Sequence, residues 1–296
     1  MAPILLRIDC TYVFPALQYF YWLSMTVAAV AAVIIPEIRS WHRYGKLRGE
    51  GNGDGGDQPS ASWLDSLTVP KRWFILFYVL GFVWTVLLIV TKGLIVAIPL
   101  EYTVCEDGSA RQFTNFHPIP LLIYLGHLTR RLIEEFISPP SNAQMHVAGF
   151  LVGASFYGFF PLALASSVAT ADTFEPISFG LGLGLFAFGS WHQYVCHKIL
   201  RELRGRGGIS GNYGLPQGDW FKWSSSPHYL AEIVLYIGLA FICYSFGSVP
   251  IDLIMGVAFT SINLCITGAR THEWYLRRFP EEYKKQRRWK VIPYVF

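Results

Sequence analysis

The chain has 296 residues, of which 52% are hydrophobic and only 15% are charged, and its mean hydropathy is +0.35. A soluble domain carries about 25% charged residues, so this composition excludes an ordinary soluble protein and indicates a polytopic membrane protein. The net charge of +4 reflects where the basic residues sit along the chain and does not indicate a nucleic-acid-binding protein.

Several apolar runs approach or exceed the roughly 20 residues that a helix needs to cross a bilayer. The first run is too long for the core of a signal peptide and its positive charges follow it, so it is predicted to be a retained anchor. We predict an all-α fold with seven transmembrane helices, over residues 12–35, 73–98, 119–138, 144–169, 176–199, 228–246 and 249–268.

Lys and Arg are concentrated after the first, fifth and seventh predicted helices, whereas loops 99–118 and 170–175 contain few of them. The positive-inside rule therefore places the N-terminus in the lumen and the C-terminus in the cytosol. The predicted organisation is an N-terminal membrane region, 1–138, which contains a flexible linker at 49–62, and a C-terminal region, 139–296. The C-terminal region contains a loop at 200–227 and a tail at 269–296.

Polar residues inside the predicted helices gather in their cytosolic halves, where ionisable groups usually line a protein cavity. The pairs Arg130/Glu134 and Arg131/Glu135 can simply neutralise each other along one helix. The clustering nevertheless favours a shared polar cavity that opens to the cytosol. The residues concerned are His127, Arg130, Arg131, Glu134, Glu135, Asn142, His146, His192, Gln193, His197, His228, Glu232, Asn263, Arg270, His272 and Tyr275.

Other motifs in the sequence are weaker indicators of function. Glycines 180, 182 and 184 have the spacing of a dinucleotide loop but follow no strand, so we expect them to let two helices approach closely. The histidines are too scattered for a metal centre, and none is predicted. Cys10 and Cys105 both face the lumen in this topology, where they either pair or remain two free thiols.

The glycine-rich loop after residue 199 is cationic and joins two polar helix ends, which indicates a site for an anionic cofactor. A nicotinamide dinucleotide phosphate brings phosphate groups that suit arginine. These arginines can also be positive-inside charges only. The available cations are Arg201, Arg204, Arg206, Arg270 and Arg277.

The run Tyr213–Phe221 (Tyr-Gly-Leu-Pro-Gln-Gly-Asp-Trp-Phe), the segment Tyr229–Ile233 and the tail His272–Phe296 resemble the C-terminal domain of the steroid 5α-reductase family. Residues Arg43–Lys46 and His127–Glu134 resemble its polyprenol reductase branch. The resemblance implies seven helices in the endoplasmic reticulum membrane, a site facing the cytosol, NADPH, and reduction of a carbon–carbon double bond. It also implies a long-chain polyprenoid substrate, a product used for dolichol synthesis and N-glycosylation, and neither nucleic acid nor an obligatory protein partner.

The resemblance assigns site residues by position. The steroid branch has asparagines and an aspartate at the positions of Gln193, His197 and His228, and a tyrosine at the position of His127. These differences disfavour a steroid substrate. The predicted catalytic residues are His127, His272 and Tyr275. The predicted cofactor-binding residues are Asn142, Gln193, His197, Arg201, Arg204, Tyr213, His228, Glu232 and Arg270.

Hydride addition to a double bond needs an atom that can take the negative charge. An α,β-unsaturated aldehyde supplies its oxygen, whereas an allylic alcohol offers no such group. Polyprenal is therefore preferred to polyprenol as substrate, with His127 as the donor to its oxygen. The alternatives are a steroid 3-oxo-Δ4 5α-reductase, an isoprenylcysteine-methyltransferase-like enzyme that binds S-adenosylmethionine, and a non-catalytic lipid-binding or scaffold protein.

Overall fold

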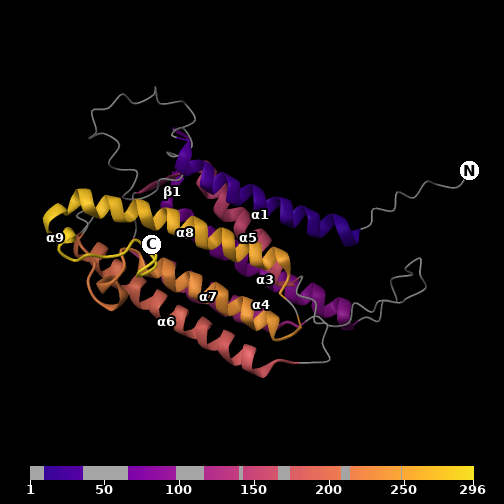
Figure 1. The fold of residues 1–296 in the computed structure, drawn as a ribbon. Coiled ribbons are helices and arrows are strands. Elements are labelled where there is room, and N and C mark those ends of the chain that lie inside the picture. Colours follow the sequence, from indigo (N-terminus) through magenta and orange to yellow (C-terminus); the bar gives the residue numbers. More distant parts are fainter. Residues whose placement is uncertain are drawn as a thin grey trace, which may run out of the picture.

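The computed structural model describes residues 10–35, 66–97, 117–139, 143–165, 174–207, 214–247 and 249–296. Within these ranges, seven long helices coincide with the seven predicted ones (Figure 1). They are α1 (Cys10–Ile34), α3 (Phe74–Ala97), α4 (Ile119–Phe136), α5 (Val147–Ala165), α6 (Pro176–Gly207), α7 (Pro227–Tyr244) and α8 (Ile251–Arg278). The shorter helices are η3 (Lys71–Trp73), η4 (Asp219–Lys222) and α9 (Pro280–Lys284).

Five of the described helices, α1, α3, α5, α7 and α8, are long and apolar enough to cross a membrane. The chain is therefore a mostly helical membrane protein. Helices α4 and α6 are not among these five, and the second half of α4 carries the charged side chains of Arg130, Arg131 and Glu134. Those side chains form the polar cluster described below.

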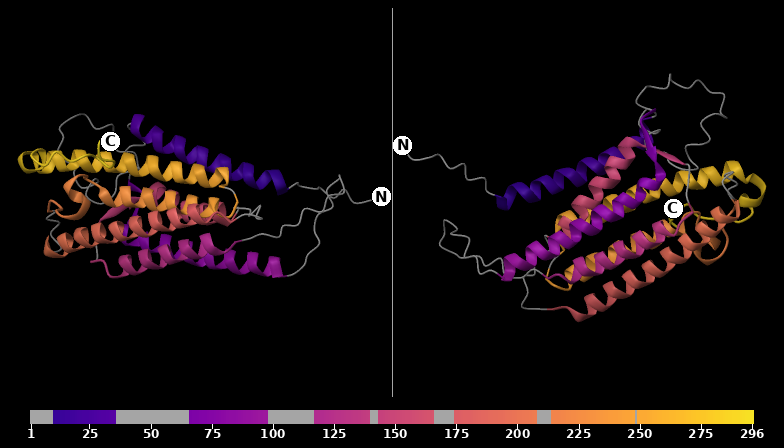
Figure 2. Two further views of the ribbon diagram at one scale, coloured as in Figure 1. Left: turned by 60° about the horizontal axis from the view of Figure 1, so that its bottom comes forward. Right: turned by 180° about the vertical axis from the view of Figure 1, so that it is seen from behind.

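The helices lie alongside one another in one elongated bundle, which Figure 2 shows from two further sides. Helix α6 packs most extensively against α7, α1 packs against α8, and α3 packs against both α4 and α5. Aromatic rings from four helices fill the centre: the ring of Trp22 lies 5.9 Å from those of Phe156 and Phe259, and Phe160 lies 4.7 Å from Tyr236. This core fixes α1, α5, α7 and α8 against each other.

Glycines let α6 and α7 approach closely. A Cβ atom added to Gly182 would lie 2.8 Å from the carbonyl oxygen of Gly238, and one added to Gly189 would lie 2.6 Å from that of Ala231. The expected role of the glycine run is thus confirmed at Gly182. At Gly180 and Gly184 an added Cβ would meet no atom within 4 Å.

The structure is mostly helical, as predicted, and contains in addition a small sheet that was not predicted. Strand β1 (Thr68–Pro70) pairs antiparallel with β2 (Gln144–His146), with Thr68 opposite His146. His146, expected inside the fourth helix, therefore belongs to a strand, and α5 begins one residue later. Three-residue strands contain too few positions to show an alternating hydrophobic pattern, so they follow only from the tertiary pairing.

The C-terminal tail folds back onto the segment between α6 and α7. The amide of Trp289 donates to the carbonyl of Trp223 at 2.8 Å, and the amide of Ser225 donates to the carbonyl of Trp289 at 2.8 Å. The tail, α9 and the polar ends of α6 and α8 consequently gather at one end of the bundle (Figure 1).

Candidate functional site

A cluster of charged and polar side chains lies between α4 and α6. Glu134 is buried, and both Arg130 and Arg131 donate to its carboxylate. Nδ1 of His197 lies 2.8 Å from the same carboxylate, and Arg130 also donates to the side-chain carbonyl of the buried Gln193. Two residues predicted to bind the cofactor, His197 and Gln193, are therefore held by one carboxylate and one guanidinium.

This cluster differs from the expected pairing along α4. The predicted pair Arg130/Glu134 forms, but Arg131 pairs with Glu134 and not with Glu135. Arg131 also donates to the hydroxyl of Tyr78 on α3 at 2.7 Å, and its guanidinium lies 5.0 Å from the centre of that ring. Arg131 is therefore held between the Glu134 carboxylate of its own helix and the Tyr78 hydroxyl of α3.

His127 lies one turn before the pair of arginines. Its side chain is 3% exposed, and its Nδ1 lies 3.2 Å from Nη2 of Arg130. Tyr124 stacks on it at 6.0 Å between ring centres. Glu232 of α7 interacts electrostatically with Arg130 and Arg131. Helices α4, α6 and α7 thus bring His127, Gln193, His197 and Glu232 into one neighbourhood.

A second cluster joins the start of α7, the end of α8 and the tail. The Ser225 hydroxyl lies 2.7 Å from Nδ1 of His272, contacts the hydroxyl of Tyr283, and donates to the carbonyl of Trp289 at 2.9 Å. The Tyr283 hydroxyl lies 2.9 Å from the same nitrogen of His272. Ser225 and Tyr283 are each 1% exposed, whereas His272 is half-buried.

Counting hydrogens fixes the tautomer of His272. A carbonyl only accepts, so Ser225 uses its single hydrogen on Trp289, and its oxygen must accept from the Tyr283 hydroxyl and from His272. His272 therefore carries its hydrogen on Nδ1 and, when neutral, presents an unprotonated Nε2. Such a histidine can accept a proton at Nε2 and return it.

His228 lies between the two clusters. Its ring is 5.5 Å from that of His197 and 4.1 Å from that of Tyr229, and it follows Ser225 by three residues. Tyr275 belongs to the second cluster, since its ring stacks on that of Tyr283 at 5.3 Å. Six of the predicted residues thus lie in two clusters, with His228 between them.

Comparison with known proteins identifies the family of this chain. Residues 142–296 match the family model described as 3-oxo-5-alpha-steroid 4-dehydrogenase. The chain belongs to the steroid 5α-reductase family. It is 32% identical to a protein named polyprenal reductase 2 from Arabidopsis thaliana over 77% of this chain and 83% of that one. It is 29% identical to the polyprenal reductase of Xenopus tropicalis over 86% of each chain, and 28% identical to polyprenal reductase 2 of Oryza sativa subsp. japonica over 95% and 98%.

This family membership makes the protein an oxidoreductase that acts on a carbon–carbon double bond. The matched range contains the second cluster, His197, His228 and Glu232, whereas His127 and the arginines of α4 precede it. The two clusters thus combine side chains from inside and outside the range that the family model matches.

Other predicted residues have different surroundings. Nη2 of Arg270 donates to the carbonyl of Ala32 at 2.8 Å, which ties α8 to α1. Arg201 is half-buried and Arg204 is exposed near the end of α6. Asn142, Tyr213 and Cys105 lie outside the described residues, as does the side chain of Cys10.

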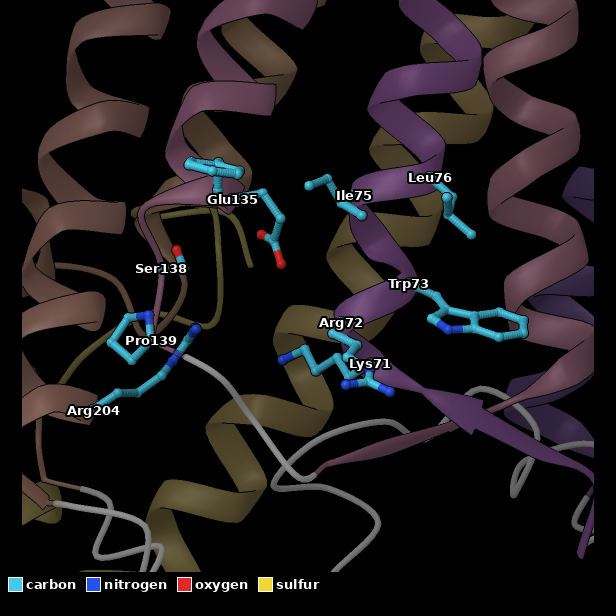
Figure 3. Close-up of a pocket in the computed structure, with 10 residues that line it drawn as sticks. Lys71, Arg72, Trp73, Ile75, Leu76, Glu135, Ser138, Pro139 and Arg204 are labelled. Atoms are coloured by element: carbon cyan, nitrogen blue, oxygen red, sulfur yellow. The ribbon is translucent and has the colours of Figure 1, made fainter.

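A cavity opens beside these clusters, between the start of α3, the end of α4 and the end of α6. Figure 3 shows Glu135, Ser138 and Arg204 on one side and Lys71, Arg72 and Ile75 on the other. Arg204 is the predicted site residue that lines it. Three cations and one carboxylate make the lining positive, so it is suited to an anionic ligand.

Sequence reasoning missed several residues of these clusters. Ser225 is the central acceptor of the second cluster, and its signal was the run of three serines before Pro227, the first residue of α7. It also missed the contact between His192 and Asp219, whose Nδ1 and Oδ1 atoms lie 3.0 Å apart, with Trp220 stacked on the imidazole at 4.1 Å. Asp219 follows Gly218 at φ 94° and has φ 39° itself, a turn that no local pattern indicated.

Proposed function

We propose that the protein reduces the α-isoprene double bond of polyprenal with NADPH, to give the saturated aldehyde on the route to dolichol and N-glycosylation. The names of its relatives support a polyprenal substrate. The observation that carries the proposal is the environment of His127, a buried imidazole whose Nδ1 accepts from Arg130. An Arg side chain only donates, so the neutral His127 ring has its hydrogen on Nε2 and can donate to an aldehyde oxygen.

The reaction adds one hydride to the β-carbon and one proton to the α-carbon, and the aldehyde is retained. Bound NADPH supplies the hydride. Negative charge gathers on the aldehyde oxygen, where a preorganised donor such as Nε2 of His127 stabilises it. The proton comes from a general acid, a role that suits His272 in its protonated form, with Tyr275 beside it.

The residues at the polar end of the bundle fit a dinucleotide phosphate. Cations there outnumber the carboxylates that pair with them: Arg204 is exposed beside the cavity, and the Nε and Nη1 atoms of Arg288 have no acceptor among the described residues. Gln193, His197, Arg201, His228 and Glu232 are the further described residues that we assign to the cofactor. Asn142, Tyr213 and Arg270 remain assigned to it from the resemblance.

The proposal includes the placement of the chain in the membrane. We assign seven spans in the endoplasmic reticulum membrane, with the N-terminus in the lumen and the site facing the cytosol, and a division into regions 1–138 and 139–296. An apolar groove between α3 and α5, lined by Leu76, Leu80, Val83 and Phe150, is a surface of the kind that an isoprenoid chain needs.

The test is a mass-spectrometric assay with NADPH that carries deuterium at C4 of the nicotinamide. Purified protein is offered polyprenal, polyprenol and a 3-oxo-Δ4 steroid in separate reactions, with heat-denatured protein as the control. Deuterium in the saturated aldehyde alone supports the proposal. Label from polyprenol alone overturns the aldehyde assignment, label from the steroid alone overturns the substrate class, and no label from folded protein overturns the activity.

A further inference from the structure

The C-terminal tail returns toward the membrane-spanning part of the bundle after α9. Its backbone contacts the residues that precede α7: the amide of Trp289 donates to the carbonyl of Trp223 at 2.8 Å, and the Ser224 hydroxyl donates to the carbonyl of Lys290 at 3.4 Å. In Figures 1 and 2 the chain end marked C accordingly lies back from α9, over the side of the bundle. The tail therefore lies beside the start of α7 and not beyond the tip of the molecule.

The lengths of α7 and α8 indicate the depth of this level in the membrane. Helix α8 begins shortly after α7 ends, so the end of α7 and the start of α8 lie at the same membrane boundary. At about 1.5 Å per residue, Pro227 of α7 and Gly268 of α8 each lie roughly 26 Å from that boundary, close to the roughly 30 Å thickness of the hydrocarbon core. The buried side chain of Val291 packs against Gly268, where an added Cβ atom would lie 2.2 Å from its Cγ2. The tail thus reaches the level at which the hydrocarbon core ends.

Exposed aromatic side chains and lysines occur together at this level. Trp223 is 57% exposed and Tyr294 is 86% exposed, and the rings of Trp289 and Tyr294 lie 5.6 Å apart. The Nζ atom of Lys290 lies 4.5 Å from the centre of the Phe296 ring. We call this surface the interfacial patch, and it consists of Lys222, Trp223, Trp289, Lys290, Tyr294 and Val295.

The composition of the tail matches the chemistry of a lipid headgroup layer. Residues 283–296 contain five Lys and Arg and no Asp or Glu. Trp and Tyr are enriched at membrane–water interfaces, where the ring contacts lipid and its polar tip meets water. Lysines close to an anionic leaflet are attracted to its headgroups. Because the patch lies level with the boundary of the hydrocarbon core, headgroups are the partner that this position supplies.

We propose that the interfacial patch binds the headgroup layer of the membrane, with a preference for anionic phospholipids. The rings of Trp223, Trp289 and Tyr294 lie among the headgroups, and Lys222 and Lys290 contact their anionic oxygens. Since the carbonyl of Trp289 also accepts from Ser225, the tail connects the lipid surface to the second cluster. No reacting group takes part, so this binding is independent of the proposed reaction.

The test places the photo-reactive residue p-benzoylphenylalanine at position 294, in the full chain, in nanodiscs of phosphatidylcholine and phosphatidylserine in equal parts. Irradiation followed by mass spectrometry of the protein identifies the molecule that position 294 contacts, and a phospholipid adduct is expected. The same residue in place of Glu281, an exposed residue of α9, is expected to form none. Substitution at Val295 repeats the measurement if the variant at Tyr294 does not fold.

The ratio of phosphatidylserine to phosphatidylcholine adducts tests the role of charge. One lysine near an anionic leaflet strengthens the attraction by about fivefold, so Lys222→Gln combined with Lys290→Gln is expected to lower this ratio by about fivefold or more. The control, Lys284→Gln combined with Lys285→Gln, removes two charges at the end of α9, outside the patch, and is expected to change the ratio less than about twofold.

Three results overturn the binding of lipid by the patch: no lipid adduct in folded protein, equal adducts at positions 294 and 281, or a cross-link to a second protein chain in place of lipid. An unchanged adduct ratio after replacement of Lys222 and Lys290 overturns the preference for anionic phospholipids.

Discussion

Nη2 of Arg130 lies 3.2 Å from Nδ1 of His127, one turn away on α4. The arginine can only donate, and this contact therefore makes Nδ1 of His127 an acceptor and leaves the ring hydrogen on Nε2. Glu134, which receives hydrogen bonds from Arg130 and Arg131, holds the arginine in place. The carboxylate thereby orients a neutral histidine through the guanidinium.

Replacing His127 with Ala is expected to lower kcat for polyprenal by about a hundredfold, since removal of one donor to a developing oxyanion has an effect of that size. The matched control is His117→Ala, because His117 precedes the other end of α4 and stacks on Phe246 at 4.6 Å. Steady-state assays of both folded variants decide the point. Normal turnover by the His127 variant removes it from the mechanism.

Ser225 is expected to position His272 without touching substrate. Ser225→Ala removes the oxygen that accepts from Nδ1 of His272, so kcat should fall about tenfold while KM for NADPH changes little. Ser226→Ala is the control, because the hydroxyl of that neighbouring buried serine has no hydrogen-bond partner among the described residues. Equal kcat values for the two variants would show that the Ser225 hydroxyl does not orient the imidazole.

Stability at alkaline pH reports on Tyr283. Burial raises the pKa of its phenol above the ordinary value of 10.0. The folded protein then holds this proton where the unfolded chain loses it, so the stabilisation is full below about pH 10 and falls as pH rises further toward the folded-state pKa. The difference in Tm between wild type and Tyr283→Phe should therefore shrink above pH 10.

Glu134 is expected to stabilise the fold as well as to orient His127 through Arg130. Glu134→Gln removes the carboxylate that accepts hydrogen bonds from both Arg130 and Arg131. Breaking a buried ion pair in this way lowers the free energy of unfolding by about 3 kcal/mol. Glu135→Gln, at the adjacent half-buried position in the cavity wall, should cost less than about 0.5 kcal/mol. Unfolding in detergent measures both, and equal losses would contradict the assignment of Glu134 as the shared counter-ion.

Alanine substitutions in the glycine run of α6 should act in opposite directions. Gly182→Ala places a Cβ 2.8 Å from the backbone of α7 and forces the two helices apart, so Tm should fall. Gly184→Ala meets no atom within 4 Å and gains about 0.5–1 kcal/mol of helix propensity, so Tm should rise. A rise in both variants would mean that α6 and α7 do not approach as closely as described.

The sequence predicted the positions of the long helices because hydrophobic runs of bilayer length are a local signal. It also indicated that His127, Gln193, His197 and Glu232 belong together, since charged groups within apolar segments have few alternatives to facing one another. It did not predict the partner of Arg131, because the hydroxyl of Tyr78 comes from a helix about fifty residues away in sequence. Local spacing on α4 favoured Glu135 as the partner of Arg131, whereas Arg131 contacts Glu134 and, across the helices, Tyr78.

Hydropathy and charge bias by themselves determined that this is a membrane protein, and the ordered motifs of its C-terminal half determined its family. Both signals are carried by residues that are close in the chain. The tertiary structure alone decided that Ser225 lies within hydrogen-bond distance of His272, that β1 pairs with β2, and that part of the Arg288 guanidinium is buried without an acceptor among the described residues. Each of these joins segments separated by dozens of residues, and hydrogen-bond partners depend on positions in space that no local pattern specifies.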